Sequence, residues 1–391
     1  MSVKEYKLSE IDFSFSQTNV IFKRGCIKDL PDLILKLKNI DDDPRTALFI
    51  GGGSLEKTGQ LQKIQKSLID KGIDSFIFSC GSEEAQVEIV NAGVKFCIEN
   101  NIKVIVGIGG GSVMDTAKAV SGIVVNGGTM EDYHDGKQFV EHGLPLILIP
   151  TTSGTGSEAS NNAVILDKKR KIKKSIRGSQ IQAIHALLDP ELVLTCPPNI
   201  TAYSGGDAFV QAIEAYFSKY SHELSDMYAL KSIQLIADYL PTVYENGNDI
   251  EARSAVHLGA YLAGVAFSNV RLGAIHGFAH PIGVLFDVPH GLICSLLLPY
   301  VLEFNRPVRE EKYKKLEEIM KNSKANYKGA NLNEMIFDFL EKLHIPKRLS
   351  ELGIKETDFD AIVKDTKGGS LDANPRPTTP ELLKEILKSA L

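Results

Sequence analysis

The sequence has little of what marks secreted, membrane or nucleic-acid-binding proteins. Its five cysteines are far apart and form no CxxC pair, which indicates reduced thiols rather than a disulfide framework or a zinc cage. The net charge is only −5, so we expect no nucleic acid among its partners. No apolar run approaches the roughly 18 residues of a membrane span, and the first residues contain no signal peptide. We therefore expect a cytoplasmic protein without membrane contact.

What is present points to a globular protein of more than one domain. The 391 residues are 43% hydrophobic and 24% charged, and this length exceeds what one hydrophobic core usually serves. Glycine is abundant at 33, and some of these glycines cluster in three short runs. Histidine is scarce, yet three of the nine histidines fall between positions 276 and 290. These two concentrations are the candidate functional sites.

The first half of the chain alternates between two patterns. Short apolar runs that end in Gly, Ser or Thr lie at 46–54, 74–80, 104–112 and 144–152. Helix-like stretches lie at 55–71, 83–100 and 112–125. This alternation predicts a parallel sheet covered on both faces. Beyond about residue 195 only helical spacing remains, so we predict an α/β domain at 1–194 and an all-α domain at 195–391.

Two of the glycine-rich loops have the composition of phosphate-binding turns. VIVGIGGGS at 104–112 leads from a strand into a helix, and PTTSGTGSE at 150–158 also follows an apolar strand. Glycines let a phosphate approach the backbone, and a helix N-terminus offers free N–H groups. Each loop alone also fits a plain strand-to-helix turn. Two of them at strand ends indicate a dinucleotide site.

The third glycine run bears on the choice of cofactor. Gly51, Gly52, Gly53 and Ser54 follow a strand at a position where NAD-binding sheets often carry a carboxylate for the adenosine ribose. Glycine N–H groups, a hydroxyl and the nearby Lys57 would accept a 2′-phosphate that a carboxylate would repel. The run therefore predicts NADP selectivity, with a simple turn as the alternative interpretation.

A carboxylate and three histidines form the second candidate site. Asp207 and Gln211 are four residues apart on one predicted helix, as are His276 and His280 on another, and His290 follows in a Pro-His-Gly loop. Such a set suits a divalent transition metal with an open coordination position. The metal would polarise a carbonyl or alcohol oxygen. The alternative interpretation is a group of histidines satisfied within the core.

Taken together, the motifs resemble the iron-containing (group III) alcohol dehydrogenases over nearly the whole chain. The matching segments are GGGSxxD (109–115), PTTxGTGSE (150–158), ALLDPELV (186–193), GGDAFxxAIEAY (205–216), HGFAHPIG (276–283), PHG (289–291) and NPRP (374–377). The resemblance implies an N-terminal Rossmann-like dinucleotide-binding domain and an all-α C-terminal domain, the dehydroquinate synthase-like fold, with the active site between them.

The resemblance also implies which residues contact the cofactor. The pyrophosphate would lie on Gly110, Gly111 and Ser112, with Asp115 supporting their loop. Further contacts would come from Thr151, Thr152 and Thr155. Lys173 stands where the family has a cofactor-contacting lysine, although the basic run 168–174 also reads as a solvated charge cluster. The run from Gly51 to Ser54 resembles the butanol-dehydrogenase branch, which prefers NADP.

The metal site carries the one departure from the family pattern. Asp207, His276 and His290 match three of the four ligands of Fe²⁺ or Zn²⁺, and His280 matches the histidine beside the nicotinamide and substrate, a candidate proton relay. The family has histidine four residues after the aspartate, and this chain has Gln211. Three outcomes stay open: Gln211 ligates weakly, a water takes its place, or the enzyme works without metal.

We therefore expect an NAD(P)-dependent oxidoreductase that interconverts a small primary alcohol and its aldehyde, with NADPH-dependent reduction favoured. The family resemblance implies a homodimer or larger homo-oligomer. Three alternatives remain: a metal-independent reductase, a nucleotide-binding sensor with little turnover, and dehydroquinate-synthase-like chemistry. The last would need several Lys and Arg for a phosphorylated substrate, and the segments 204–217 and 274–291 contain none.

Overall fold

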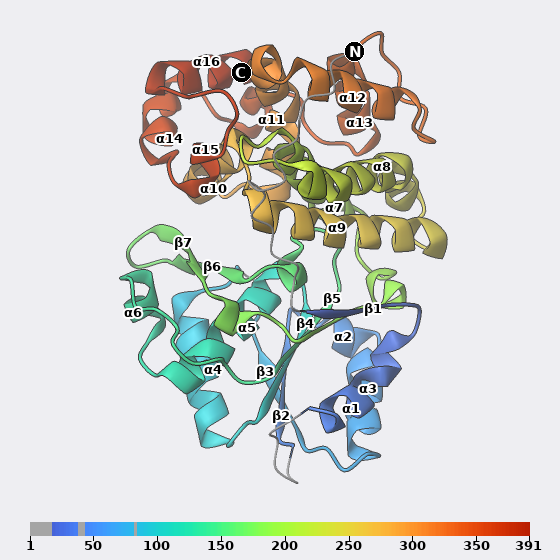
Figure 1. The fold of residues 1–391 in the computed structure, drawn as a ribbon, viewed down its shortest axis with the longest axis vertical. Coiled ribbons are helices and arrows are strands. Elements are labelled where there is room, and N and C mark those ends of the chain that lie inside the picture. The colour runs from blue at the N-terminus through green and yellow to red at the C-terminus, as the bar shows by residue number, and fades with distance from the viewer. Residues whose placement is uncertain (1–17, 38–43, 82–83) are drawn as a thin grey trace.

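The computed structural model describes residues 18–37, 44–81 and 84–391 (Figure 1). An α/β half and a helical half lie one against the other, which confirms the predicted fold class. The last strand of the main sheet ends at Leu188, and the first long helix of the second half begins at Pro198. The division expected at 194/195 falls between these two points, and we keep it as the proposed domain boundary.

The α/β half is built on one six-stranded sheet in the order β1-β8-β5-β4-β2-β3, and all its strand pairs are parallel. Its strands are β1 (Asn19–Phe22), β2 (Thr46–Ile50), β3 (Ser75–Ser79), β4 (Val104–Gly109), β5 (Leu146–Pro150) and β8 (His185–Leu188). Every residue of β2, β4 and β5 is buried. Their unbroken apolar runs reflect helices on both faces of the sheet.

Helices flank the sheet on both sides (Figure 1). One group is α1 (Leu30–Leu35), α2 (Ser54–Lys57) and α3 (Gln60–Ile69), and the other is α4 (Val87–Glu99), α5 (Gly111–Asn126) and α6 (Met130–His134). Because side chains alternate along a strand, Phe49 packs in the α4–α5 core and Leu48 in the α1–α3 core. The helix expected at 55–71 is broken at Gly59, whose φ is +70°. Residue 83, where another expected helix starts, lies outside the described residues.

The second half consists of packed helices. They are α7 (Pro198–Phe217), α8 (Glu223–Glu245), α9 (Ile250–Val270), α10 (Ala274–Phe286), α11 (His290–Asn305), α12 (Glu310–Lys321), α13 (Leu332–Lys342), α14 (Phe359–Asp365), α15 (Gly369–Asp372) and α16 (Pro380–Ala390). The run 205–217 of α7 is buried throughout, because α8, α9 and α11 surround it. Pro281 lies inside α10, which continues to Phe286. Thr379 caps α16 by accepting a hydrogen bond from the Leu382 N–H.

Across the described ranges, no single helix has both the length and the apolar character to cross a membrane. The pair α9 and α10, bent by 105°, meets those criteria only when the two helices are taken together.

The sequence analysis did not predict one element of the α/β half. Strands β6 (Asn162–Asp167) and β7 (Ile172–Arg177) form an antiparallel hairpin beside the main sheet. Part of the basic run 168–174 is thus a strand, and Lys173 is only partly exposed on it. The hairpin contributes side chains to the candidate site described next.

Candidate active site

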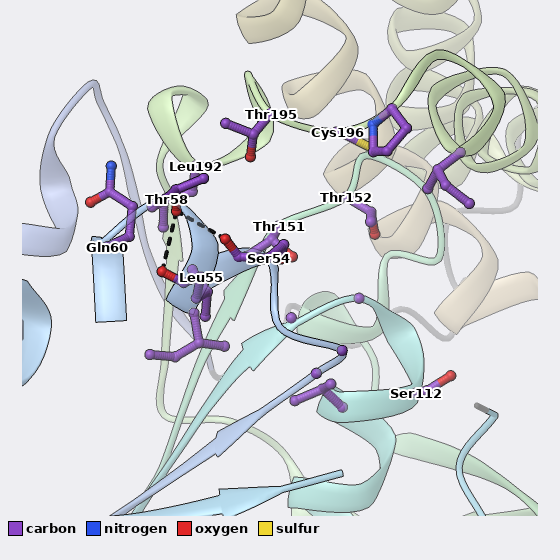
Figure 2. A pocket seen from close by; sticks show the side chains of 18 of the residues that line it. Ser54, Leu55, Thr58, Gln60, Ser112, Thr151, Thr152, Leu192, Thr195 and Cys196 are labelled. Atoms are coloured by element: carbon purple, nitrogen blue, oxygen red, sulfur yellow. Dashed lines mark hydrogen bonds between the residues drawn. The ribbon is translucent and has the colours of Figure 1, made fainter. Parts of the chain in front are cut away.

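Two adjacent cavities lie where the carboxyl ends of the sheet strands meet the helical half. The first has a volume of about 320 Å³ and opens at the ends of β2, β4 and β5 (Figure 2). Its lining comprises Gly51, Gly52, Ser54, Leu55, Thr58, Gln60, Gly81, residues 108–113, Thr151, Thr152, Glu191, Leu192, residues 195–197 and Ile200. The predicted glycine loops and the Thr151–Thr152 pair therefore share one cavity.

The loop between β4 and α5 presents its backbone to the first cavity. Gly110 precedes α5 in an extended conformation, and a Cβ there would meet no atom closer than Thr152 Oγ1 at 3.4 Å. A Cβ on Gly111 would instead lie 2.5 Å from Thr155 Cγ2. Packing therefore requires glycine at position 111, whereas glycine at position 110 keeps the backbone open to a ligand. The first N–H groups of a helix have no partner within it, and such a helix start is suited to an anion.

The loop after β2 lines the other end of the cavity. Gly51, Gly52 and Ser54 reach it, but Gly53 does not: with φ +85°, Gly53 makes the left-handed turn that starts α2. Lys57 is exposed and also lies outside the lining. None of the lining residues between 51 and 60 is acidic.

Figure 2 shows hydroxyl groups on this cavity that sequence reasoning missed. The Thr58 hydroxyl donates to the Ser54 carbonyl at 3.0 Å, and Thr195 faces the cavity from the opposite side. Thr58 follows the recognised glycine run, but Thr195 lies far along the chain. Thr195 reaches the cavity only because the segment after β8 packs over the carboxyl ends of the strands.

The second cavity, of about 310 Å³, lies beside the first and shares Gly111 and Ser112 with it. Its lining includes the predicted residues Asp115, Thr155, Lys173, Asp207, Gln211, His276, His280 and His290, together with Glu84, Ala85, Ser157, Ser160, Asn162, Val164, Ser175, Arg177, Phe267, Arg271, Leu272 and Ser370. Thr155 thus lies in a different cavity from Thr151 and Thr152. Three cations line this cavity although the segments 204–217 and 274–291 contain none. Lys173 and Arg177 come from the unpredicted β7, and Arg271 lies between α9 and α10.

Asp115 ties the glycine loop to its surroundings. Its carboxylate accepts hydrogen bonds from Ser157 Oγ at 2.6 Å and from the Val164 N–H at 2.9 Å. The fully buried Lys118 donates to Ser157 Oγ at 2.7 Å, and burial lowers the pKa of Lys118 to about 8. Burial also raises the pKa of the neighbouring Glu158 to about 7. This polar cluster holds α5, the 150–158 loop and β6 together.

The structure brings the predicted carboxylate and histidines together from three helices. Asp207 lies on α7, His276 and His280 lie on α10, and His290 is the first residue of α11. Asp207 Oδ1 lies 3.3 Å from His276 Nε2 and 3.8 Å from His290 Nε2. The rings of His280 and His290 are 5.5 Å apart. Among the described residues, neither Asp207 Oδ1 nor His276 Nε2 has a hydrogen-bond partner, although both side chains are buried.

Close helix contact makes this assembly possible. A Cβ on Gly291 would lie 2.0 Å from the Tyr203 carbonyl oxygen, so the start of α11 touches the backbone of α7. A Cβ on Gly206 would lie 2.2 Å from Ser295 Oγ on the same pair of helices. Glycine at these positions lets His290 reach Asp207.

Glu214 fixes the orientation of His276. Its carboxylate accepts from the Ile275 N–H at 2.7 Å and pairs with His276 Nδ1 at 2.6 Å. In the tautomer with the proton on Nδ1, Nε2 would carry the lone pair that a metal can bind. Sequence reasoning missed Glu214, although its place two helical turns after Asp207 was a usable signal.

The fourth position of the site differs from the predicted set. Gln211 Nε2 donates to Asp207 Oδ2 at 2.8 Å, and Gln211 Oε1 has no partner among the described residues. Cys294 Sγ lies 3.6 Å from His290 Nε2. Donor atoms of Asp207, His276, His290 and Cys294 all lie within 4.8 Å of one another. The sequence analysis treated Cys294 only as a reduced thiol, although its spacing of four from His290 was a signal.

The electrostatics of the two remaining histidines favour the neutral ring. Burial lowers the pKa of His290 to about 4 and holds the pKa of His280 well below its ordinary value. A neutral imidazole is the form that binds a metal or accepts a proton. The unpartnered buried donor atoms and the mixed O, N and S set fit a divalent transition metal.

Two family models match the sequence over most of the chain. Residues 17–190 match the family model "Iron-containing alcohol dehydrogenase", and residues 201–391 match "Fe-containing alcohol dehydrogenase family, C-terminal". The NAD-dependent methanol dehydrogenase of Bacillus methanolicus is 33% identical over 376 residues, 95% of this chain and 97% of that protein. The NADPH-dependent butanol dehydrogenase of Clostridium saccharobutylicum is 33% identical over 369 residues, 90% and 93%.

Solved structures agree with the family match. A crystal structure of 1,3-propanediol oxidoreductase has a TM-score of 0.89 at 28% identity and covers 97% of this chain and 100% of that one. The sulfoacetaldehyde reductase of Bifidobacterium kashiwanohense in complex with NAD⁺ has a TM-score of 0.88 at 25% identity, covering 97% and 98%.

Proposed function

The chain belongs to the iron-containing alcohol dehydrogenase family and is an NAD(P)-dependent alcohol dehydrogenase or aldehyde reductase; from this premise we propose that it reduces small aldehydes to primary alcohols with NADPH as the preferred hydride donor. The observation that carries the proposal is the contact between the two cavities. They share Gly111 and Ser112, at the start of α5. One extended dinucleotide would place its pyrophosphate there and its two ends in different cavities.

The first cavity would hold the adenosine end of the cofactor. Gly51, Gly52 and Ser54 would receive the 2′-phosphate, because the lining residues of their loop include no carboxylate to repel it. Gly53 would act only by shaping the turn. Thr151 and Thr152 would contact the middle of the cofactor. The nicotinamide would enter the second cavity beside Thr155, Lys173 and His280, with Asp115 supporting the loop from below.

In the second cavity, Asp207, His276 and His290 would hold a divalent metal, with Gln211 as the fourth candidate from the family pattern. A bound Fe²⁺ or Zn²⁺ would polarise the substrate oxygen so that the carbonyl carbon accepts the hydride. Glu214 orients His276 for this role. His280 is not part of the ligand set; its buried Nδ1 has no partner among the described residues, and its neutral ring would pass the proton between the substrate oxygen and solvent.

A specific observation favours a second candidate substrate class, an aldehyde that carries an anionic group. Lys173 is paired with Glu84 at 2.5 Å. Within the described part of the chain, Arg177 and Arg271 line the same cavity without a carboxylate partner. A relative that is 30% identical over 387 residues is the sulfoacetaldehyde reductase of Bilophila wadsworthia. An unpaired guanidinium pair would attract a sulfonate or carboxylate.

We also propose a cytoplasmic homodimer or larger homo-oligomer. Strand β1 lies at the edge of the sheet and exposes Val20 and Phe22. A strand that lies at the edge among the described strands and carries exposed apolar side chains suits contact with a second copy. Light scattering coupled to size exclusion tests the oligomer.

Steady-state kinetics test the main proposal. NADPH and NADH oxidation are compared with neutral aldehydes of two to five carbons and with sulfoacetaldehyde. We expect a higher kcat/KM with NADPH, and a fall for sulfoacetaldehyde alone in Arg271→Ala if the anionic class is the substrate. A clear NADH preference would contradict the role given to the loop 51–54.

A further inference from the structure

The NH₂ group of the Gln211 amide already has a hydrogen-bond partner, the Asp207 carboxylate. Its Nε2 donates to Asp207 Oδ2 at 2.8 Å, and only the NH₂ end of an amide can face a carboxylate in this way. Both side chains are buried. The hydrogen bond occupies the amide nitrogen, while Gln211 Oε1 is buried without a partner among the described residues. The contact therefore orients Asp207, with Oδ1 left facing the histidines.

Cys294 lies where a fourth donor is needed. It stands one helical turn after His290 on α11, so both side chains project from the same face. Four donors at about 2.0–2.3 Å from one ion in a tetrahedron lie roughly 3.3–3.7 Å apart. The distances here are 3.3 Å for Asp207–His276, 3.8 Å for Asp207–His290 and 3.6 Å for His290–Cys294. These three of the six donor–donor spacings are close to those of a tetrahedral metal site, and all six lie within 4.8 Å.

We propose that Cys294 supplies the fourth metal ligand, in place of the histidine that Gln211 replaces, so that the metal centre is Asp207, His276, His290 and Cys294. The buried and unpartnered Asp207 Oδ1 and His276 Nε2 point to the same centre independently of the cysteine. Gln211 is a positioning residue that acts through Asp207. This inference rests on the metal-assisted function proposed above.

The chemistry of the site follows from the thiol. When Sγ binds a divalent ion, the S–H bond breaks, a sulfur–metal bond forms and one proton leaves to solvent. No electron is transferred. A thiolate is a softer donor than imidazole and suits Zn²⁺.

Cobalt substitution tests the proposal with a readout other than activity. The full chain is stripped with a chelator, dialysed and titrated with Co²⁺ under anaerobic conditions. We expect one Co²⁺ per chain and a near-ultraviolet thiolate-to-cobalt charge-transfer band. Cys294→Ala should remove the band and weaken Co²⁺ binding at least ~10-fold, a loss that even outer partners of a metal can cause. Cys97→Ala, a buried cysteine of α4, is the matched control and should keep both.

A rescue variant keeps the test decisive if Cys294→Ala folds poorly. The double variant Gln211→His/Cys294→Ala restores the ligand set of the family and should bind Co²⁺ again without the thiolate band. Three results would each overturn the inference: Co²⁺ binding by the wild type without the band, unchanged Co²⁺ binding by Cys294→Ala, or no Co²⁺ binding by the wild type.

Aldehyde-dependent NADPH oxidation, measured on the same samples, separates this result from the proposed function. Activity without the thiolate-to-cobalt band would refute only the proposal that Cys294 is a ligand. The band without activity would refute the proposed reaction and would still support Cys294 as a ligand.

Discussion

Replacing Gly110 by alanine should weaken cofactor binding without harming the fold. Gly110 lies directly before α5 with φ −79° and ψ −172°, a conformation that alanine adopts freely. Its added methyl group would contact only Thr152, at 3.4 Å from Oγ1 and 3.6 Å from Cγ2. The methyl would, however, project into the cavity at the N-terminus of α5, where the pyrophosphate would approach. The substitution therefore changes access to the backbone and little else.

The expected size of the effect follows from the hydrogen bonds at stake. A hydrogen bond to a charged group contributes about 1.5–3 kcal/mol. Losing one such bond from a backbone N–H to the pyrophosphate raises the KM for NADPH about 10- to 100-fold, because 1.4 kcal/mol corresponds to a factor of ten. The thermal midpoint should hold or rise, since alanine restricts the unfolded chain by about 0.4–1 kcal/mol.

Two assays on two variants check this. Initial rates over a range of NADPH concentrations give KM, and thermal unfolding gives stability. Gly283→Ala is the control: it lies on α10 outside both cavities, and its Cβ would meet nothing closer than the Val288 carbonyl at 3.5 Å. Its KM should not change. If Gly110→Ala keeps the wild-type KM, the pyrophosphate does not lie at the start of α5 and the cofactor placement is wrong.

Three further outcomes follow from the site. Glu214→Gln removes the charge that holds His276 Nδ1 and should weaken Co²⁺ binding about 10-fold, measured by titration of the chelated protein; equal affinity would contradict its orienting role. Gly51→Asp places a carboxylate in the first cavity, and the ratio of kcat/KM for NADPH over NADH should fall at least ~10-fold. An unchanged ratio would contradict the proposal that the loop 51–54 selects NADPH. Burial raises the pKa of Glu158 to about 7, so its stabilising protonated form is lost as pH rises from 4.5 through 7. The advantage of Glu158→Gln in unfolding free energy should therefore grow by about 2–3 kcal/mol between pH 5 and pH 8, and a flat difference would refute the buried charge.

The fold was predictable where one local pattern decides the structure. The runs before Gly51, Gly110 and Thr151 are continuous apolar strands because helices cover both faces of the sheet. The β6–β7 hairpin escaped prediction because the basic turn and the two lysines of β7 hide its alternation. The hairpin is not part of the main sheet, so the alternation of strands and helices along the sequence does not indicate it.

The sequence predicted only those relations within the site that lie along one helix. The spacing of four placed Asp207 with Gln211 and His276 with His280. The contact between α7 and α11 depends on the absence of side chains at Gly291 and Gly206, and no local pattern reports it. Cys294 was overlooked for this reason. Its spacing from His290 becomes informative only once α11 is known to pack against Asp207.

The most direct test of the account follows the hydride itself. The protein is incubated with butanal and NADPH that is dideuterated at nicotinamide C4, and the alcohol is analysed by mass spectrometry. The account predicts one deuterium on C1 of butanol for each NADPH consumed, at a higher rate than with NADH labelled in the same way. Butanol without deuterium, or NADPH consumed without butanol, would contradict it.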